Sequence, residues 1–149
     1  MMLSTHFSLQ EMTASETAAR HGIDNTPSLE VASQLTRTAM CLELIRTLLQ
    51  YPIHISSGFR CLALNEEIGS KPTSQHVTGH AVDFTCPQYG DPRQVMTAIF
   101  RHRVEINYDQ LILEFYNEKT GSGWVHISFT DTPRVVSLTI DQNGTRAFT

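Results

Sequence analysis

Two histidines and one aspartate in this chain, His76, Asp83 and His126, have the types and spacing of a metal-binding group. Two imidazoles and one carboxylate suit a catalytic zinc ion that keeps one coordination position for water. The seven-residue spacing of His76 and Asp83 would separate them by roughly 10 Å along one helix, which is too far for a shared ion. We therefore predict a turn that carries His76, a break at Gly79, and a strand that carries Asp83.

Motifs in separate parts of the chain resemble those of the M15 zinc peptidases. This family includes D-alanyl-D-alanine carboxypeptidases and phage L-alanyl-D-glutamate endopeptidases. The similar motifs, in chain order, are Ser56–Arg60, Leu64–Asn65, Ser74–Asp83 and Trp124–His126. The segments that resemble the phage and prophage branch are His6–Leu9 and Ala18–Asn25. The resemblance covers nearly the whole chain and implies a fold of the hedgehog/D-Ala-D-Ala peptidase type.

The resemblance also implies roles for four residues. His76, Asp83 and His126 would bind zinc, and Arg60 would contact the substrate or the developing oxyanion. Three protein ligands leave a position for a water whose pKa falls to near 7. Arg60 suits its role because a guanidinium stays charged and binds carboxylates in bidentate fashion. The alternative for Arg60 is an ordinary surface ion pair.

The general base is the open part of the site, because amide hydrolysis needs a group that takes a proton from the water. Many members of the family carry a glutamate three residues before the last histidine ligand, and this chain has Gly123 there. Glu114 is our candidate, since it ends the preceding predicted strand and can lie across from His126. Its alternative is an exposed edge carboxylate, and Glu118 in the following turn is a weaker candidate for the base.

Other polar and aromatic residues of the motifs are expected around the metal. Ser74 and Gln75 are predicted to orient the histidine ligand or to donate to the substrate. Trp124 is predicted to form a wall of the cleft and to contact the substrate. His80 follows His76 by four residues, but a helix through Gly79 would leave Asp83 unexplained, so we expect His80 at the rim.

Composition limits the range of functions. A chain of 149 residues with 40% hydrophobic residues can bury its own core, so we expect one domain over residues 1–149. The net charge of −4 and the lack of a basic run argue against nucleic-acid binding. No apolar run has the length of a membrane span, and Met1–His6 lacks the features of a signal peptide. We therefore expect a monomer that stays in the cytoplasm until a holin-type partner releases it.

The chain has three cysteines, Cys41, Cys61 and Cys86, at irregular spacing and without a C-x-x-C motif. This odd number predicts reduced, buried or partly buried thiols. The alternative places Cys61 or Cys86 near the metal without making either a ligand.

Helices are expected in the first half of the chain and strands in the second. Capping-box patterns at Ser8–Glu11 and Thr13–Glu16 predict two short helices that stop at Gly22. Thr26-Pro27 predicts the start of a long amphipathic helix that ends near Tyr51. Further helices are expected over 62–68 and from 91, and strands over 53–56, 82–85, 110–115, 124–129 and 135–140. This order indicates an α+β fold, with helices packed on a small antiparallel sheet that carries the zinc cleft.

Strand alternation predicts one apolar face of the sheet and one reactive face. The side chains expected in the core are Leu111, Leu113, Phe115, Val125, Ile127 and Phe129. The opposite face would collect Asp83, Glu114 and His126, with His76 reaching over from its loop.

The leading hypothesis is a zinc metallopeptidase that cleaves a peptidoglycan stem peptide. Both the terminal D-Ala-D-Ala bond and the L-Ala-D-Glu bond remain open. The N-terminal motifs and the missing signal peptide favour a lytic or wall-remodelling enzyme encoded by a phage or prophage. The alternative is a non-catalytic zinc-binding module of structural or wall-binding type, since hedgehog signalling domains resemble this fold and Gly123 replaces the expected base.

Overall fold

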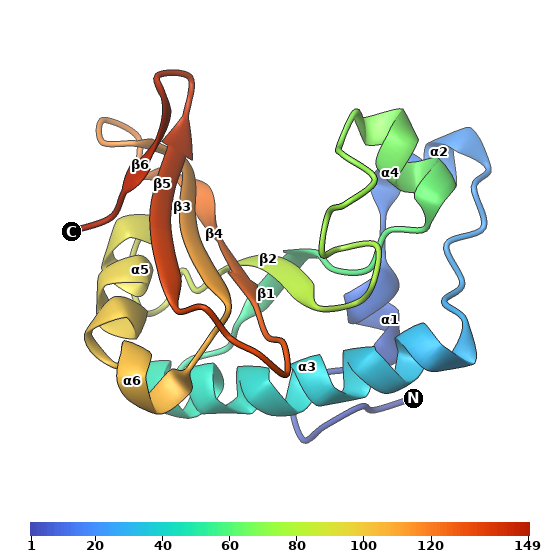
Figure 1. The fold of residues 1–149 in the computed structure, drawn as a ribbon, viewed down its shortest axis with the longest axis horizontal. Coiled ribbons are helices and arrows are strands. Elements are labelled where there is room, and N and C mark those ends of the chain that lie inside the picture. The colour runs from blue at the N-terminus through green and yellow to red at the C-terminus, as the bar shows by residue number, and fades with distance from the viewer.

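A computed structural model describes all residues, 1–149. The helices are α1 (Leu9–Thr13), α2 (Glu16–His21), α3 (Leu29–Leu49), α4 (Leu62–Ile68), α5 (Pro92–Arg101) and α6 (Arg103–Ile106). The strands are β1 (His54–Ser57), β2 (Ala81–Thr85), β3 (Gln110–Asn117), β4 (Ser122–Ser128), β5 (Val136–Asp141) and β6 (Gly144–Ala147). In Figure 1, β3 to β6 with α5 lie at one end of the long helix α3, and α2 with α4 lie at the other end. Strands β1 and β2 cross the space between these two parts.

The six strands form one sheet in the order β1-β2-β4-β3-β5-β6. The predicted α+β class is confirmed, but the sheet is mixed, because β5 runs parallel to β3. The connection after β4 passes β3 and brings β5 to the far side of β3, where β5 pairs with β3 in parallel. Strand β6 was missed by the sequence prediction since all its residues are exposed and it has no apolar alternation.

Two helix starts differ from the sequence prediction. The capping box at Ser8 is present, but α2 begins after Ser15, whose side chain accepts from the Ala18 amide, and not after Thr13. The long helix α3 is capped by Ser28. Thr26 instead donates its amide and hydroxyl to the Asp24 carboxylate in a short turn.

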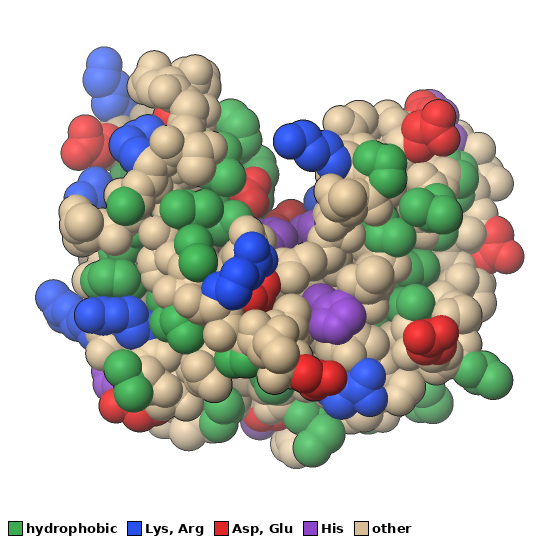
Figure 2. Space-filling model, viewed as in Figure 1, with side chains coloured by type: hydrophobic (Ala, Val, Ile, Leu, Met, Phe, Trp, Pro, Cys, Tyr) green, Lys and Arg blue, Asp and Glu red, His purple; other side chains and the backbone are tan.

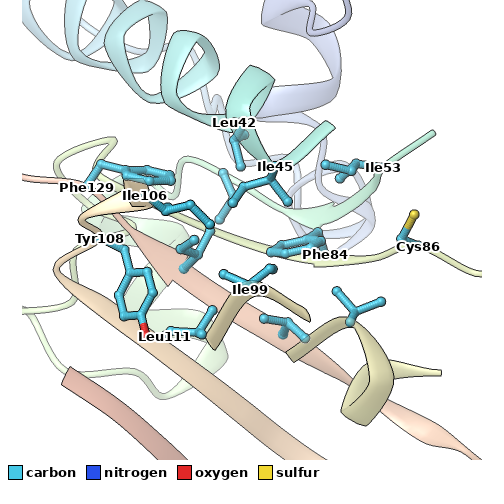
Figure 3. Close-up of a cluster of buried hydrophobic side chains, with 14 of the residues drawn as sticks. Leu42, Ile45, Ile53, Phe84, Cys86, Ile99, Ile106, Tyr108, Leu111 and Phe129 are labelled. Carbon is cyan, nitrogen blue, oxygen red and sulfur yellow. The ribbon is translucent and has the colours of Figure 1, made fainter. Parts of the chain in front are cut away.

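A cluster of 22 buried apolar side chains holds α3 and α5 against one face of the sheet. Figure 3 shows part of it, where Leu42 and Ile45 of α3 meet side chains from the strands and from α5. The predicted core residues Leu111, Leu113, Val125, Ile127 and Phe129 are buried. No helix has the length and apolar character that a membrane crossing requires.

Phe115 is the predicted core residue that lies elsewhere, since it is 46% exposed. The register shifts between Glu114 and Asn117, where two residues of β3 face Gly123 alone. A β-bulge of this kind reverses the alternation of side chains. Phe115 therefore points away from the core, and Tyr116 packs against the core instead. The Tyr116 hydroxyl donates a hydrogen bond at 2.9 Å to Asp91, the N-cap of α5.

Asp109, immediately before β3, joins three segments of the chain and is only 2% exposed. Its carboxylate accepts from the Gln75 amide at 2.9 Å and from the Arg134 backbone N, Nε and Nη2 at 3.0, 2.9 and 2.7 Å. The hydrogen bonds from Arg134 are the main reason that the pKa of Asp109 falls from 3.8 to about 2. Asp109 thus fixes the loop that carries Gln75 and its neighbour His76 to the start of β3.

The depressed pKa of Asp109 makes stability depend on pH. A carboxyl group whose pKa is lower in the folded state stabilises the protein above its unfolded pKa, and this contribution is lost as the pH falls through its folded pKa. Between about pH 4 and pH 2 we expect Asp109 to account for a loss of about 1–2 kcal/mol. Denaturant unfolding over this pH range should show a shallower pH dependence for Asp109→Asn. Identical slopes for the two proteins would contradict the assignment.

Candidate metal centre

Three buried side chains meet where the sheet faces the loop before β2. Asp83 on β2 is paired directly opposite His126 on β4, and His76 reaches them from the loop. Their potential ligand atoms all lie within 4.8 Å of one another. Figure 2 shows a hollow between the β3–β6 part of the molecule and the α2–α4 part, with histidine and acidic side chains at its floor. The predicted turn, break and strand are therefore confirmed, and they bring the three residues together.

The distances in this group suit a tetrahedral metal ion. Asp83 Oδ1 lies 2.9 Å from His126 Nδ1 and 3.3 Å from His76 Nε2. Nitrogen and oxygen ligands about 2.0–2.2 Å from a tetrahedral zinc ion lie roughly 3.3–3.6 Å from each other. The donor set of two imidazoles and one carboxylate fits zinc with little rearrangement.

Asp83 is ionised in this environment. Burial by itself would raise the pKa of Asp83, but hydrogen bonds from His126 and His76 and the charges of both imidazoles hold it far below its usual range. An ionised carboxylate is the form that binds a metal. The group therefore has its negative ligand in place at any ordinary pH.

His76 is oriented by a backbone contact at the end of β1. Its Nδ1 donates to the Gly58 carbonyl at 2.7 Å, which leaves Nε2 for the metal. Gly58 lies so close to α1 that a Cβ atom there would be 2.2 Å from the Met12 carbonyl oxygen. That same oxygen accepts from the Phe59 amide at 2.8 Å. Only glycine allows this approach, so the Ser-Gly-Phe-Arg motif includes a residue that positions a ligand.

Asn25 joins the end of α1 to the segment that follows Gly58. Its Nδ2 donates to the Thr13 and Phe59 carbonyls, both at 2.9 Å, and its Oδ1 accepts from the Cys61 amide at 2.8 Å. Arg60 lies between Phe59 and Cys61, and its own amide donates to the His76 carbonyl at 3.1 Å. Sequence reasoning assigned Asn25 no role; the signal available was its place in the N-terminal segment that resembles the phage branch.

Arg60 lies inside the site as predicted. Its Nη2 is 3.4 Å from Asp83 Oδ2, its Nε donates to Ser57 Oγ at 3.2 Å, and its side chain is only 13% exposed. Arg60 is therefore a largely buried cation beside the ligand group and not an ordinary surface ion pair.

Glu114 also reaches the site, although its direct partner on β4 is Trp124 and not His126. Its Oε1 lies 3.7 Å from His126 Nδ1, and its side chain is 19% exposed. Burial is the main cause that raises the pKa of Glu114, and the nearby charge of Asp83 adds to it. Glu118, the weaker candidate, is exposed in the turn after β3.

The backbone around Gly123 leaves no free space for a side chain at this position. The φ of Gly123 is +117°, and a Cβ would lie 2.8 Å from the Tyr116 Cα and 2.9–3.0 Å from the carbonyl oxygens of Glu114 and Phe115. The bulge in β3 occupies the space in which a residue at position 123 would project. A base at position 123 would therefore require the backbone of β3 to shift, and Glu114 on the neighbouring strand is the carboxylate that reaches the site.

The remaining predicted residues surround the group without joining it. Ser74 Oγ accepts from the His76 amide at 3.3 Å, and Gln75 binds Asp109, so both orient the loop. Trp124 stacks on Phe115. His80 Nδ1 lies 2.7 Å from the Thr78 hydroxyl and outside the metal group.

The cysteines are free thiols with no part in this group. Cys61 caps α4, with its sulfur accepting from the Leu64 amide at 3.5 Å. The Cys86 thiol donates to the Pro52 carbonyl at 3.2 Å. The potential ligand group contains neither sulfur.

Comparison with known families agrees with this geometry. Residues 5–128 match the family model described as Peptidase M15. The match includes all three residues of the metal group together with Arg60 and Glu114, and it ends at the last residue of β4. No curated protein matches the chain.

We expect Gly123→Ala to lower the free energy of unfolding by about 2–4 kcal/mol, because it adds a backbone clash to an unfavourable φ. Gly144→Ala is the matched control, since Gly144 has φ +106° and open space around its Cα. It should lose only about 1–2 kcal/mol. Urea unfolding of both variants measures the difference, and equal losses would show that the close approach at Gly123 is unimportant.

We expect Asn25→Ala to lower the free energy of unfolding by about 2–4 kcal/mol, because three hydrogen bonds between separate backbone segments are lost. Asn143→Ala removes an exposed asparagine from the β5–β6 turn and should change stability by less than about 0.5 kcal/mol. Denaturant unfolding compares the two. Similar small effects at both positions would contradict the role given to Asn25.

Proposed function

Since the chain belongs to the peptidase M15 family, we propose that it is a zinc-dependent peptidase that hydrolyses an amide bond in the peptidoglycan stem peptide. The observation that carries the proposal is the buried group of His76, Asp83 and His126 with Glu114 beside it. Three protein ligands with an adjacent carboxylate are the arrangement of a hydrolytic zinc site rather than a structural one, which has four protein ligands.

Each residue of the site has a distinct task. A zinc ion held by the three ligands would supply a water of lowered pKa and positive charge for the carbonyl oxygen. Glu114 takes the proton of the attacking water and returns it to the leaving nitrogen, and its raised pKa suits both steps. Arg60 supplies a fixed positive charge for the developing oxyanion or for a substrate carboxylate.

The position of Glu114 supports catalysis over the alternative of a non-catalytic zinc-binding module. That alternative rested on the missing carboxylate at Gly123. Glu114 fills this function from the opposite strand, with its carboxylate 3.7 Å from a ligand nitrogen. A module that only binds metal has no need of a second buried carboxylate beside the ligands.

We further propose that the enzyme is of phage or prophage origin and acts on the wall after release by a holin-type partner. The support is the resemblance of the N-terminal motifs to that branch of the family. The scissile bond is D-Ala-D-Ala or L-Ala-D-Glu, and a cleft that holds Arg60 beside the metal suits the acidic groups of either substrate.

Incubation of the protein with muropeptides, with zinc or with a chelator, tests the proposal when the products are identified by mass spectrometry. We expect one stem-peptide bond to be cleaved only when zinc is present. His126→Ala should lose both the bound metal and the cleavage, because it removes a ligand. The absence of chelator-sensitive cleavage from several types of wall would favour the non-catalytic module.

Glu114→Gln separates catalysis from metal binding. We expect this variant to keep stoichiometric zinc, measured by metal analysis, and to lose about 100-fold or more in kcat, because general-base catalysis contributes about 10²–10⁴-fold. Glu118→Gln, in the exposed turn, is the matched control and should keep its rate. Unchanged cleavage by Glu114→Gln would refute Glu114 as the base.

A further inference from the structure

Two aromatic side chains form a stacked pair beside the candidate metal centre. The rings of Phe115 and Trp124 have centroids 5.6 Å apart and planes inclined by 30°. Trp124 is paired with Glu114 across the sheet and lies two residues before His126 on the same face of β4. Side chains two residues apart on a strand are roughly 7 Å apart. Two or three residues of an extended substrate would therefore span the distance from the metal group to the aromatic pair.

The backbone at Phe115 is unfavourable for an aromatic residue. Its φ is +49°, a region that glycine and asparagine adopt far more readily than bulky residues. The anchor of Tyr116 to Asp91 explains the bulge, but it does not require a ring at Phe115. A strained residue near an active site is a reason to look for a functional role.

The exposure of Phe115 is also unexplained by folding. The ring is 46% exposed, whereas regular alternation would have placed it in the core. Burial of a phenylalanine side chain stabilises a protein, so an exposed ring held by strained backbone contributes less to folding than a buried one. The structure thus presents an aromatic surface to solvent at the edge of the metal cleft.

The chemistry of this surface selects its ligand. The pair carries no charge, and the ionisable groups around Glu114 are of both signs, since Asp83 is accompanied by His126 and Arg60. The charges beside the pair therefore select neither an anion nor a cation, and the rings themselves determine what binds on them. The π face of an aromatic ring is electronegative and attracts the weakly positive C–H groups of an apolar surface. The face of a sugar ring has such C–H groups and matches a phenyl ring in size.

We propose that Phe115 and Trp124 form a platform that stacks an N-acetylated sugar ring of the glycan to which the stem peptide is attached. This inference rests on the proposed function and specifies its substrate. In peptidoglycan the sugar is joined to the L-Ala end of the stem, so it lies one residue from the L-Ala-D-Glu bond and several residues from D-Ala-D-Ala. At about 3.3 Å per residue, only the L-Ala-D-Glu bond lets the sugar reach the platform. The platform therefore assigns cleavage to the glycan end of the stem.

Trp124 provides the binding assay, because it is the only tryptophan of the chain. We expect N-acetylmuramyl-L-Ala-D-isoGln to change its fluorescence in metal-free protein and to bind about tenfold more tightly than L-Ala-D-isoGln. Phe115→Asn removes the ring and suits the positive φ, so it should fold at least as stably and lose this preference. Phe115→Tyr should keep it. Tyr89→Asn, which removes an aromatic residue of similar exposure (41%) on the loop before α5, is the control and should also keep it.

With zinc present, the ratio of kcat/KM for sugar-bearing and sugar-free stem peptides should fall about tenfold in Phe115→Asn. Equal affinity of the wild type for the two ligands, or an unchanged preference in Phe115→Asn, would overturn the platform. Because the fluorescence assay uses metal-free protein, a sugar preference without any cleavage would refute the peptidase and not the platform. Cleavage without a sugar preference would refute the platform and not the peptidase.

Discussion

The hydrogen bond from His76 Nδ1 to the Gly58 carbonyl is the interaction on which the rest of the site depends. Asp83 and His126 are held by the pairing of β2 with β4, but His76 lies on a loop and has no such support. The Gly58 carbonyl that accepts this hydrogen bond is fixed in turn by the close approach of Gly58 to Met12. His76 is thus held as firmly on its loop as Asp83 and His126 are on their strands. The reason is that the carbonyl which binds the His76 ring belongs to backbone that packs directly against the backbone of α1.

Other parts of the chain that are remote in sequence support the same loop. Asp109, at the start of β3, holds Gln75, and Asn25 joins the end of α1 to both neighbours of Arg60. These contacts use side-chain amides and a carboxylate to satisfy buried backbone groups. Such groups are costly to leave unpaired, so the contacts stabilise the fold and position the site at the same time.

The two carboxyl groups of the site, Asp83 and Glu114, have pKa values shifted in opposite directions. Asp83 accepts hydrogen bonds from two imidazoles, which outweigh the effect of its burial, whereas Glu114 is affected mainly by its burial and then by the charge of Asp83. The pKa of Asp83 therefore falls and the pKa of Glu114 rises. Pairs of groups with opposite shifts are a common basis for a division of roles, here between a permanently charged ligand and a group that exchanges protons.

The sequence alone was sufficient to identify the three residues of the metal group and the α+β class. Ligand chemistry limits which side chains can bind zinc, and the seven-residue spacing of His76 and Asp83 excluded a shared helix. Motif resemblance pointed to Arg60, and alternation put Glu114 on the same face as His126. All of these inferences depend on local patterns, which a single sequence contains.

The tertiary structure alone decided the features that depend on contacts between distant segments. Phe115 fits the core pattern of its strand, and nothing in the local sequence shows that a bulge opposite Gly123 turns it outward. The roles of Asn25 and Asp109 likewise need partners 25–36 residues away. The sequence by itself therefore determined which groups do the chemistry, since that follows from residue type and local spacing. Only the folded chain decided how they are held and what lies beside them, because backbone packing between remote segments sets those positions.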